Sequence, residues 1–421
     1  MSRILGGSLF AFAAVLVVLV SYPPTQHRAF LVLLVVGVLV FVVSKPELVL
    51  LTVAVYISFV DPKSIPPEFQ FTQANVTALL AISLVWVLLR SRIDGDRLWV
   101  ALAPAVPLVV ISIRMAAAGN AKFQNAALAG LIAFGAAAMS PRQRRSALRL
   151  IPYLAVAFVL LSTFAGPVGL GRAAGISGNP NRMVFALLSF TPFIVWMYGR
   201  FRIPAMVVFL PLASVLVVRS GSAQAIPSIL AGGLLMLAMY RSGDSTTGRR
   251  QTYRSAFRLL VVLAIVAAAV NAVLALREKF VESFATLSGR TTFFALSWGE
   301  FLSSPFVGTG SSRVALDEVA GGRSSHNALL AVLAIGGFVA VVSLVPAGLL
   351  LVRNSGPMFR AVDPVLPALI IVATISLVQS TEFVPWTWYL VALGCTFRRS
   401  PRAAKSVGSE FPTETAGSGR G

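Results

Sequence analysis

The sequence predicts an all-α, polytopic integral membrane protein that crosses the bilayer about 12 to 14 times. Composition is the first reason, because 57% of its 421 residues are hydrophobic and only 12% are charged. No soluble domain of this size needs such a balance for its core. Apolar runs of roughly 15 to 20 residues, long enough to span a bilayer as a helix, recur along the chain. Basic residues also concentrate in every second connection between these runs, which is the pattern of the positive-inside rule.

Short polar or Pro- and Gly-containing breaks separate the apolar runs and define the expected spans. These lie near residues 4–20, 29–43, 47–60, 75–89, 98–113, 124–140, 150–166, 183–198, 203–218, 225–240, 258–276, 327–352, 364–378 and 385–397. The first run lacks a small-residue cleavage site and is expected to be retained as a span. We divide the chain into a membrane domain, 1–399, and a tail, 400–421, whose Ser, Gly, Thr and Pro content predicts disorder.

The formal net charge of +20 raises the question of a nucleic-acid partner, since basic stripes neutralise phosphate backbones. With the N-terminus placed inside, however, the Arg-rich stretches 90–97, 142–149, 241–258 and 398–405 all fall on the same side. The positive-inside rule therefore accounts for most of the charge and predicts that both termini are cytoplasmic. We expect membrane lipid as a partner and no nucleic acid.

One connection, 277–326, is much longer than the others and is expected on the outer face. Long loops in compact proteins tend to be functional or disordered. This one carries too many aromatic side chains for disorder. We therefore expect a partly helical extracytoplasmic cap, in which residues 295–302 lie at the membrane interface as an amphipathic helix.

His326, one of two histidines, lies where a polar stretch runs into an apolar helix, in the sequence RSSHNALL. An imidazole titrates near neutrality, so at a membrane–water boundary it can take a proton from an alcohol beside an anionic headgroup. A histidine at a helix start is also often only a cap or a solvated residue, so the surrounding pattern has to decide. Two more segments on the same side are rich in Gly, Arg and Asn, namely GRAAGISGNPN at 171–181 and SGRTTFFALSWGEFLSSPFVGTG at 288–310.

Together these segments resemble the O-antigen ligase and O-antigen polymerase family. Its members carry an Arg and Gly ahead of an Asn-Pro-Asn turn, then Ser-Gly-Arg, a Trp and a Pro-led apolar run with Gly-x-Gly. A His-Asn pair then opens a helix, with a Gly about ten residues on. All of these occur here in that order, roughly over residues 150–350.

The resemblance implies a C-type-like glycosyltransferase at the outer face of the bacterial plasma membrane. It would move a glycan from a polyprenyl-diphosphate carrier to a hydroxyl of a glycan or lipid acceptor. By position, Arg172 and Arg290 would bind the diphosphate, and His326 would act as the base or activate the acceptor. Guanidinium groups suit this role independently of the family, because the leaving diphosphate gains negative charge and arginine binds such oxygens bidentately. No metal or other cofactor is expected, since the loops lack an Asp/His cluster with ligand spacing.

Four residues are candidates for supporting roles. Arg323 either supplements phosphate binding or is a solvated charge, and Asn327 either orients His326 or caps the helix. Asn181 belongs to the Asn-Pro-Asn turn, which is expected to cap the following helix. Arg219 begins the sequence RSGSAQA, where the family often has Ser-x-Ser-Arg-Gly, and it is the candidate substitute for the missing arginine.

The chain departs from the family pattern at three positions. Ala223 and Gln224 replace the Arg and Gly of that motif, and Ile335 stands where many members place a Glu nine residues after the His. These departures bear on whether activity is retained.

Two other functions compete with glycan transfer. A flippase or exporter for lipid-linked oligosaccharides would need polar groups along a path through the bilayer, and Arg114 and Asn271 are among the few polar residues near span ends. A polyprenyl-monophosphate-sugar transferase typically has acidic pairs in its first outer loop, whereas residues 21–28 contain no acid. Ligase and polymerase differ only in their acceptor, which the loops do not specify. Attack opposite the leaving diphosphate predicts inversion at the anomeric carbon.

Overall fold

The computed structural model describes residues 44–61, 73–91, 95–120, 122–164, 173–201, 205–222, 225–242, 294–310, 327–377 and 384–397. Every regular element in these ranges is helical, with no strand among them. The helices are α3 (Pro46–Phe59), α4 (Gln73–Ser91), α5 (Gly95–Leu102), α6 (Val106–Ala117), α7 (Phe123–Ala138), α8 (Pro141–Phe164), η4 (Gly175–Ser177), α9 (Pro180–Phe201), α10 (Ala205–Ser220), α11 (Ala225–Ser242), α15 (Ala328–Arg360), α16 (Val365–Ser376) and α17 (Pro385–Cys395). A further helix covers 294–303. The expected spans near 4–20, 29–43 and 258–276 and the tail lie outside the described residues.

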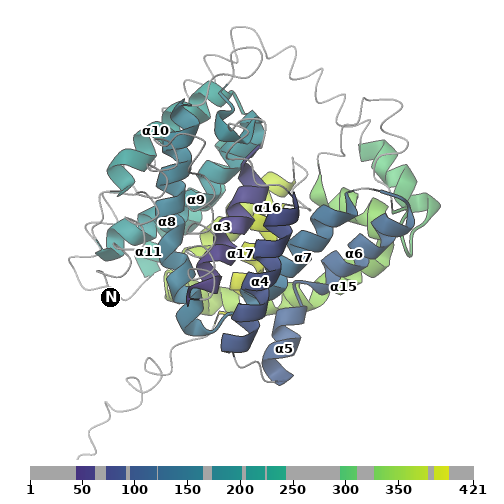
Figure 1. Ribbon diagram of the computed structural model, residues 1–421. Coiled ribbons are helices and arrows are strands. Elements are labelled where there is room, and N and C mark those ends of the chain that lie inside the picture. The colour runs from purple at the N-terminus through teal and green to yellow at the C-terminus, as the bar shows by residue number, and fades with distance from the viewer. Residues whose placement is uncertain are drawn as a thin grey trace, which may run out of the picture.

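The helices pack side by side as a bundle in which α3, α16 and α17 lie between the α8–α11 group and the α6, α7 and α15 group (Figure 1). Contacts at one end show how they alternate in direction. Arg90 near the end of α4 donates from Nη1 to the carbonyl of Ser44 just before α3 (2.6 Å), and the Ser91 hydroxyl donates to Oε1 of Gln143 at the start of α8 (3.0 Å). The starts of α3 and α8 therefore meet the end of α4, as antiparallel neighbours require.

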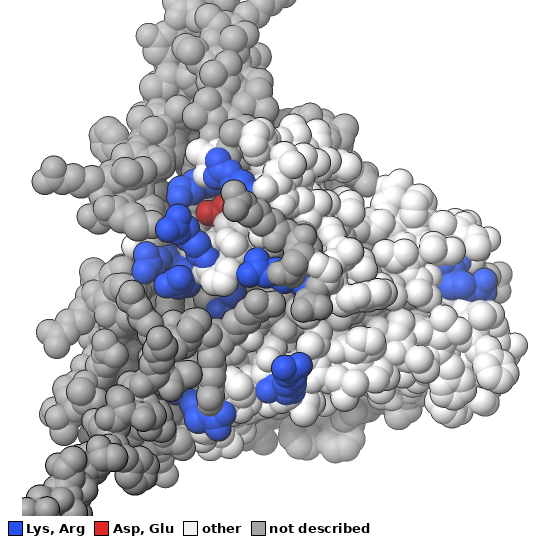
Figure 2. Space-filling view, turned by 90° about the horizontal axis from the view of Figure 1, so that it is seen from below, with Lys and Arg blue, Asp and Glu red and all other residues white. Residues whose placement is uncertain are grey.

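Basic side chains gather at this end, which we call the basic end (Figure 2). It carries Lys45, Arg90, Arg97, Arg142, Arg144, Arg145, Arg149, Arg353 and Arg360. The described side chains at the opposite end include fewer cations, namely Arg114, Lys122, Arg182 and Arg219. The charge asymmetry expected from the loops is thus present in the folded bundle.

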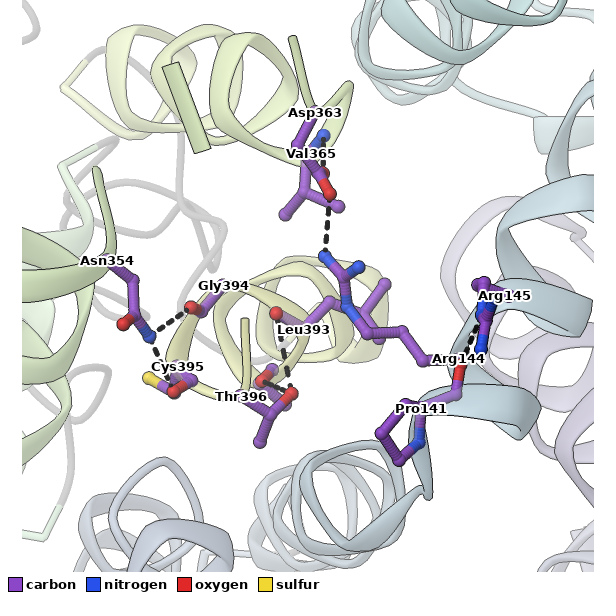
Figure 3. Close-up of polar contacts among 11 residues, drawn as sticks. Pro141, Arg144, Arg145, Asn354, Asp363, Val365, Leu393, Gly394, Cys395 and Thr396 are labelled. Atoms are coloured by element: carbon purple, nitrogen blue, oxygen red, sulfur yellow. Dashed lines mark hydrogen bonds and ion pairs between the residues drawn. The ribbon is translucent and has the colours of Figure 1, made fainter. Parts of the chain in front are cut away.

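An ion pair joins three elements at the basic end (Figure 3). Nη2 of Arg144 in α8 lies 3.1 Å from Oδ2 of Asp363 in the turn between α15 and α16, and both side chains are largely buried. The Arg144 guanidinium also lies over the ring of Phe397, 5.4 Å from its centroid, just after α17. Nearby, Nδ2 of Asn354 in α15 donates to the carbonyl oxygens of the last two residues of α17, at 2.9 and 2.7 Å.

An aromatic cluster fills the centre of the bundle, where rings from α3, α8, α9 and α17 meet. Phe59 makes edge-to-face contacts with Phe185 and Phe190, with ring centroids 5.4 and 5.6 Å apart. Trp386 contacts the rings of Phe59 and Phe190, and its indole Nε1 donates to the hydroxyl of Ser189 (2.9 Å). The indole of Trp386 is therefore buried while its N–H keeps a hydrogen-bond acceptor, as buried tryptophans usually require.

The expected spans within the described ranges fall on helices, with one correction. Residues 98–113 are not a single span, because α5 ends at Leu102 and α6 begins at Val106 after a turn. Pro104 and Pro107 explain the break, since proline lacks an amide donor and disfavours a helical residue before it. By length and composition α8 and α15 are candidate membrane-crossing helices, and the other apolar helices, such as α7, are shorter.

Large apolar side chains are exposed along one stripe of α15. Phe338, Val342, Val345, Leu349 and Val352 are between 48% and 73% exposed. Their spacing of three and four residues places them on one helix face. A stripe of this kind is typical of a surface that meets lipid or a partner rather than water.

Candidate functional site

The described residues include only part of the expected site. Four expected residues lie outside the described ranges: Arg172, Arg290, Arg323 and His326. Three lie inside them: Asn181, Arg219 and Asn327. Arg172 and His326 are directly followed in the chain by described residues, so the segments that lead away from them can be examined.

The first segment forms a junction of three chain stretches at the end opposite the basic end. We call it the Asn-Pro-Asn junction, comprising residue 61 after α3, residues 173–182 and residues 219–222, where α10 ends in a turn. The amide of Ala173 donates to the carbonyl of Arg219 (3.1 Å), and the Ser222 hydroxyl donates to Oδ1 of Asn181 (2.9 Å). The predicted GISGNPN turn and the RSG turn, about 40 residues later, are therefore neighbours.

Asn179 provides the helix cap that was expected from this motif. Its Oδ1 accepts from the backbone amides of Asn181 (2.9 Å) and Arg182 (3.2 Å), satisfying two of the donors left free in the first turn of α9. Because Asn179 caps the helix, Asn181 is left to accept from the neighbouring turn.

The same junction includes two charged residues that sequence reasoning missed, Asp61 and Arg182. The Asp61 amide donates to the carbonyl of Ile176 (2.9 Å), and its carboxylate packs against Gly178. Gly178 has a φ of +62°, and a Cβ there would lie 2.3 Å from Oδ2 of Asp61. Burial lowers the pKa of the Arg182 guanidinium, and the opposite charge of Asp61 partly counteracts this shift. An acid directly after an apolar span was the sequence signal for a charge at this place.

The predicted segment 288–310 meets α15 just downstream of the RSSHNALL segment, at what we call the loop–α15 lock. Residues 304–310, which follow the helix 294–303, lie against α15 near Gly337 (Figure 1). Four backbone hydrogen bonds join them: Thr309 N to Ala334 O (2.8 Å), Gly310 N to Ile335 O (2.9 Å), Phe338 N to Pro305 O (2.8 Å) and Val339 N to Phe306 O (3.0 Å). The helix expected at 295–302 is confirmed by the observed helix 294–303.

The lock works because α15 is broken at Gly337, whose φ of 60° and ψ of −158° are not helical. In a continuous helix the amides of Phe338 and Val339 would donate to carbonyls four residues back. Here both donate to the loop, and the two carbonyls that they leave accept from the loop instead. The helix thus exchanges two internal hydrogen bonds for four with the loop and leaves none of these groups without a partner.

Glycine is required at the contact surface on both sides of the lock. Gly308 and Gly337 both have positive φ, at 67° and 60°. A Cβ on Gly308 would lie 2.3 Å from the backbone of Ile335, and one on Gly337 would lie 2.5 Å from the backbone of Phe306. The two backbones therefore approach more closely than any side chain would allow.

Arg114 in α6 is a third component of the lock that sequence reasoning noted only as a polar residue near a span end. Its Nε donates to the carbonyl of Val307 and its Nη2 to that of Gly308, both at 2.8 Å. A guanidinium can hold two carbonyls at once because its donors form a rigid fork.

Asn327 links the His-bearing segment to the rest of the bundle. Its Oδ1 accepts from the amide of Leu330 (3.0 Å), so it caps α15, and its Nδ2 donates to the carbonyl of Leu377 at the end of α16 (3.2 Å). Since α16 packs against α9 and runs antiparallel to it, Leu377 lies at the same end as the Asn-Pro-Asn junction.

One departure from the family pattern has a structural explanation. The side chain of Ile335 is fully buried and packs in an apolar cluster with Ile111 and Met115 of α6. This position is therefore part of the helix–helix core, where an ionised carboxylate would be costly. Ala223 and Gln224 lie outside the described residues.

Within the described ranges, no group of three or more His, Cys, Asp and Glu side chains is arranged to hold a metal ion. The described charged side chains at this end include the cations Arg114, Lys122, Arg182 and Arg219 and the carboxylate of Asp61. Cations outnumber that acid. Such groups bind and orient anions.

Comparison of the chain with protein-family models, with curated proteins and with solved structures finds no match in any of the three.

Proposed function

We propose that this protein is a multi-pass glycosyltransferase of the bacterial plasma membrane, similar to O-antigen ligases and polymerases. It would transfer a glycan from a polyprenyl-diphosphate carrier to an acceptor hydroxyl at the outer face. The observation that carries the proposal is the clustering of polar segments at one end of the bundle. The Asn-Pro-Asn junction, the loop–α15 lock and the start of α15 all lie opposite the basic end.

The proposed membrane orientation follows from charge and apolar exposure. The basic end has the excess of Lys and Arg that the positive-inside rule assigns to the cytoplasm. Between the two ends, α15 exposes apolar side chains such as Val342 and Leu349 that would meet lipid. The polar segments would then lie at the outer surface, where a lipid-linked donor presents its headgroup.

The chemistry assigned to this surface uses residues of this chain alone. Arg172 and Arg290 would bind the diphosphate oxygens, whose negative charge grows as the glycosidic C–O bond breaks. His326 would take the acceptor hydroxyl proton while the acceptor oxygen bonds to the anomeric carbon. The bonding electrons of the broken C–O bond leave with the diphosphate, and the configuration at that carbon inverts.

The proposal is tested by single substitutions with a matched control. His326→Ala and Arg290→Ala are each expected to abolish glycan transfer in cells and to leave lipid-linked donor on the outer leaflet. Arg353→Ala is the control, since Arg353 is exposed at the basic end and far along α15 from the proposed site. Surface glycan and the leaflet distribution of the donor are measured in each strain.

Normal glycan transfer in both variants would contradict the proposal. Donor that accumulates on the inner leaflet would instead indicate a flippase or exporter. Adding either a lipid-anchored acceptor or a second lipid-linked glycan to the purified protein would distinguish a ligase from a polymerase.

A further inference from the structure

We infer that Arg114 is a positioning residue: its guanidinium holds the loop 304–310 on the broken helix α15 and so fixes the helix 294–303, which follows Arg290 in the chain, relative to the start of α15, which follows His326. This inference rests on the proposed function and adds to it a residue from α6, outside all of the predicted polar segments. It concerns geometry and assigns Arg114 no contact with substrate.

Described segments connect the lock to both proposed functional residues. The helix 294–303 begins four residues after Arg290 and leads into the loop 304–310, and His326 directly precedes the cap of α15. From Asn327 to the first carbonyl in the lock, that of Ala334, the helix rises only about 10 Å at 1.5 Å per residue. A shift of the loop on α15 would therefore move the helix 294–303 relative to the start of α15.

Arg114 bonds the loop to α6, whereas the four backbone hydrogen bonds of the lock join the loop only to α15. The four bonds to α15 use the amides of Thr309 and Gly310 and the carbonyls of Pro305 and Phe306. Of the next two carbonyls, that of Val307 accepts from Nε of Arg114, and that of Gly308 accepts from Nη2 of Arg114 and from the hydroxyl of Ser304 in the loop (3.1 Å). Without the fork, the carbonyl of Val307 would lose this donor and the loop would lose its side-chain hydrogen bonds to α6.

The loop also lies directly against the backbone of α6. Gly310 has a φ of +72°, and a Cβ there would lie 2.4 Å from the carbonyl oxygen of Arg114. The loop is thus held between α6 and α15, with the Arg114 side chain on one side and the Gly337 break on the other. Three elements meet at this point, and Arg114 is the side chain that bridges two of them by hydrogen bonds.

The charge of Arg114 is not cancelled by these contacts, because both acceptors are neutral carbonyls. A cation held in this way contributes a positive potential at the end where an anionic diphosphate is proposed to bind. This second effect would act on donor binding, whereas the positioning effect would act on the rate of the chemical step. The two are therefore separable by kinetics.

Removing the guanidinium should leave the helix pair intact. The contact between α6 and α15 is made by apolar side chains, including Ile111, Met115, Val332 and Ala340, that do not depend on Arg114. An Arg114→Ala variant is accordingly expected to fold, and its loop alone should loosen. Arg114→Lys keeps the charge but replaces the fork with a single ammonium, so it should restore only part of the function.

The test uses the full-length protein in lipid nanodiscs with a polyprenyl-diphosphate glycan donor and a glycan acceptor. Arg114→Ala is expected to lower kcat about 10- to 100-fold with KM for the donor nearly unchanged, because misplacement of reacting groups acts on the chemical step. Arg114→Lys should fall between this variant and wild type. Arg353→Ala is the control and should match wild type.

Amide hydrogen exchange over residues 304–310 provides a readout that does not depend on activity. Exchange should become at least about 10-fold faster in Arg114→Ala and stay unchanged in the control, since local opening exposes the lock amides. Unchanged exchange in Arg114→Ala, or a kcat equal to wild type, would overturn the inference. A wild-type protein without transfer activity would overturn the proposed function, and the exchange measurement would still decide whether Arg114 holds the loop.

Discussion

Replacing Gly337 with alanine should open the loop–α15 lock without unfolding the bundle. The residue has a φ of 60° and a ψ of −158°, a backbone region that only glycine adopts freely. A Cβ there would lie 2.5 Å from the backbone of Phe306. Both the conformation and the contact therefore oppose a side chain, and the least costly response is for α15 to straighten.

The size of the effect follows from counting hydrogen bonds. Opening the lock loses the four backbone bonds between the loop and α15. A straightened helix regains two of them as internal bonds from Phe338 and Val339, so the net loss is two. At about 0.5–1.5 kcal/mol per hydrogen bond, this amounts to about 1–3 kcal/mol. If α15 instead stays broken, the strain of alanine in this region costs a similar amount, about 1–3 kcal/mol.

The matched control is Gly348→Ala in the same helix, because a Cβ at Gly348 meets nothing within 4 Å. That substitution should leave the free energy of unfolding unchanged or raise it by about 0.5–1 kcal/mol, as alanine favours helix more than glycine does. Both variants are compared by thermal unfolding in nanodiscs and by hydrogen exchange over residues 304–310. Gly337→Ala should speed exchange there and lower stability relative to Gly348→Ala. Equal stability and equal exchange in the two variants would refute the assigned role of the break.

Three further substitutions test other contacts by thermal unfolding. Gly178→Ala should lower the free energy of unfolding by about 2–3 kcal/mol. Gly119 also has a positive φ, but a Cβ there would have no neighbour within 4 Å, so Gly119→Ala should cost only the conformational part, about 1–2 kcal/mol. Equal losses in the two variants would argue against the contact between Gly178 and the Asp61 carboxylate. Arg144→Met should destabilise the protein by about 3 kcal/mol, because it leaves Asp363 buried without its ion-pair partner. Adding Asp363→Asn to that variant should then lower stability little further. Additive losses from the two substitutions would contradict the ion pair. Trp386→Phe should lower stability by about 2–3 kcal/mol through a cavity and a lost indole hydrogen bond, and a loss below about 0.5 kcal/mol would indicate that the aromatic cluster repacks.

The positions of most helices were predictable because the signal is local. An apolar run of sufficient length forms helix wherever water is excluded, and the described helices coincide with the expected runs, as α7 and α11 do. The failure at residues 98–113 had a visible cause in Pro104 and Pro107, whose effect on the backbone acts within a few residues. Hydropathy alone did not register it, since proline interrupts a helix without making the run less apolar.

Composition and charge pattern by themselves determined an all-helical chain with an asymmetric distribution of cations, because both are sums over residues that need no knowledge of neighbours in space. Motif order likewise identified the stretches that carry Gly, Arg, Asn and His. Only the tertiary structure decided which polar groups meet, such as Arg114 with a carbonyl 193 residues away, or Asn181 with Ser222. The physical reason is that a hydrogen bond depends on distances of about 3 Å and on direction, and packing of the whole bundle sets these between segments far apart in the chain.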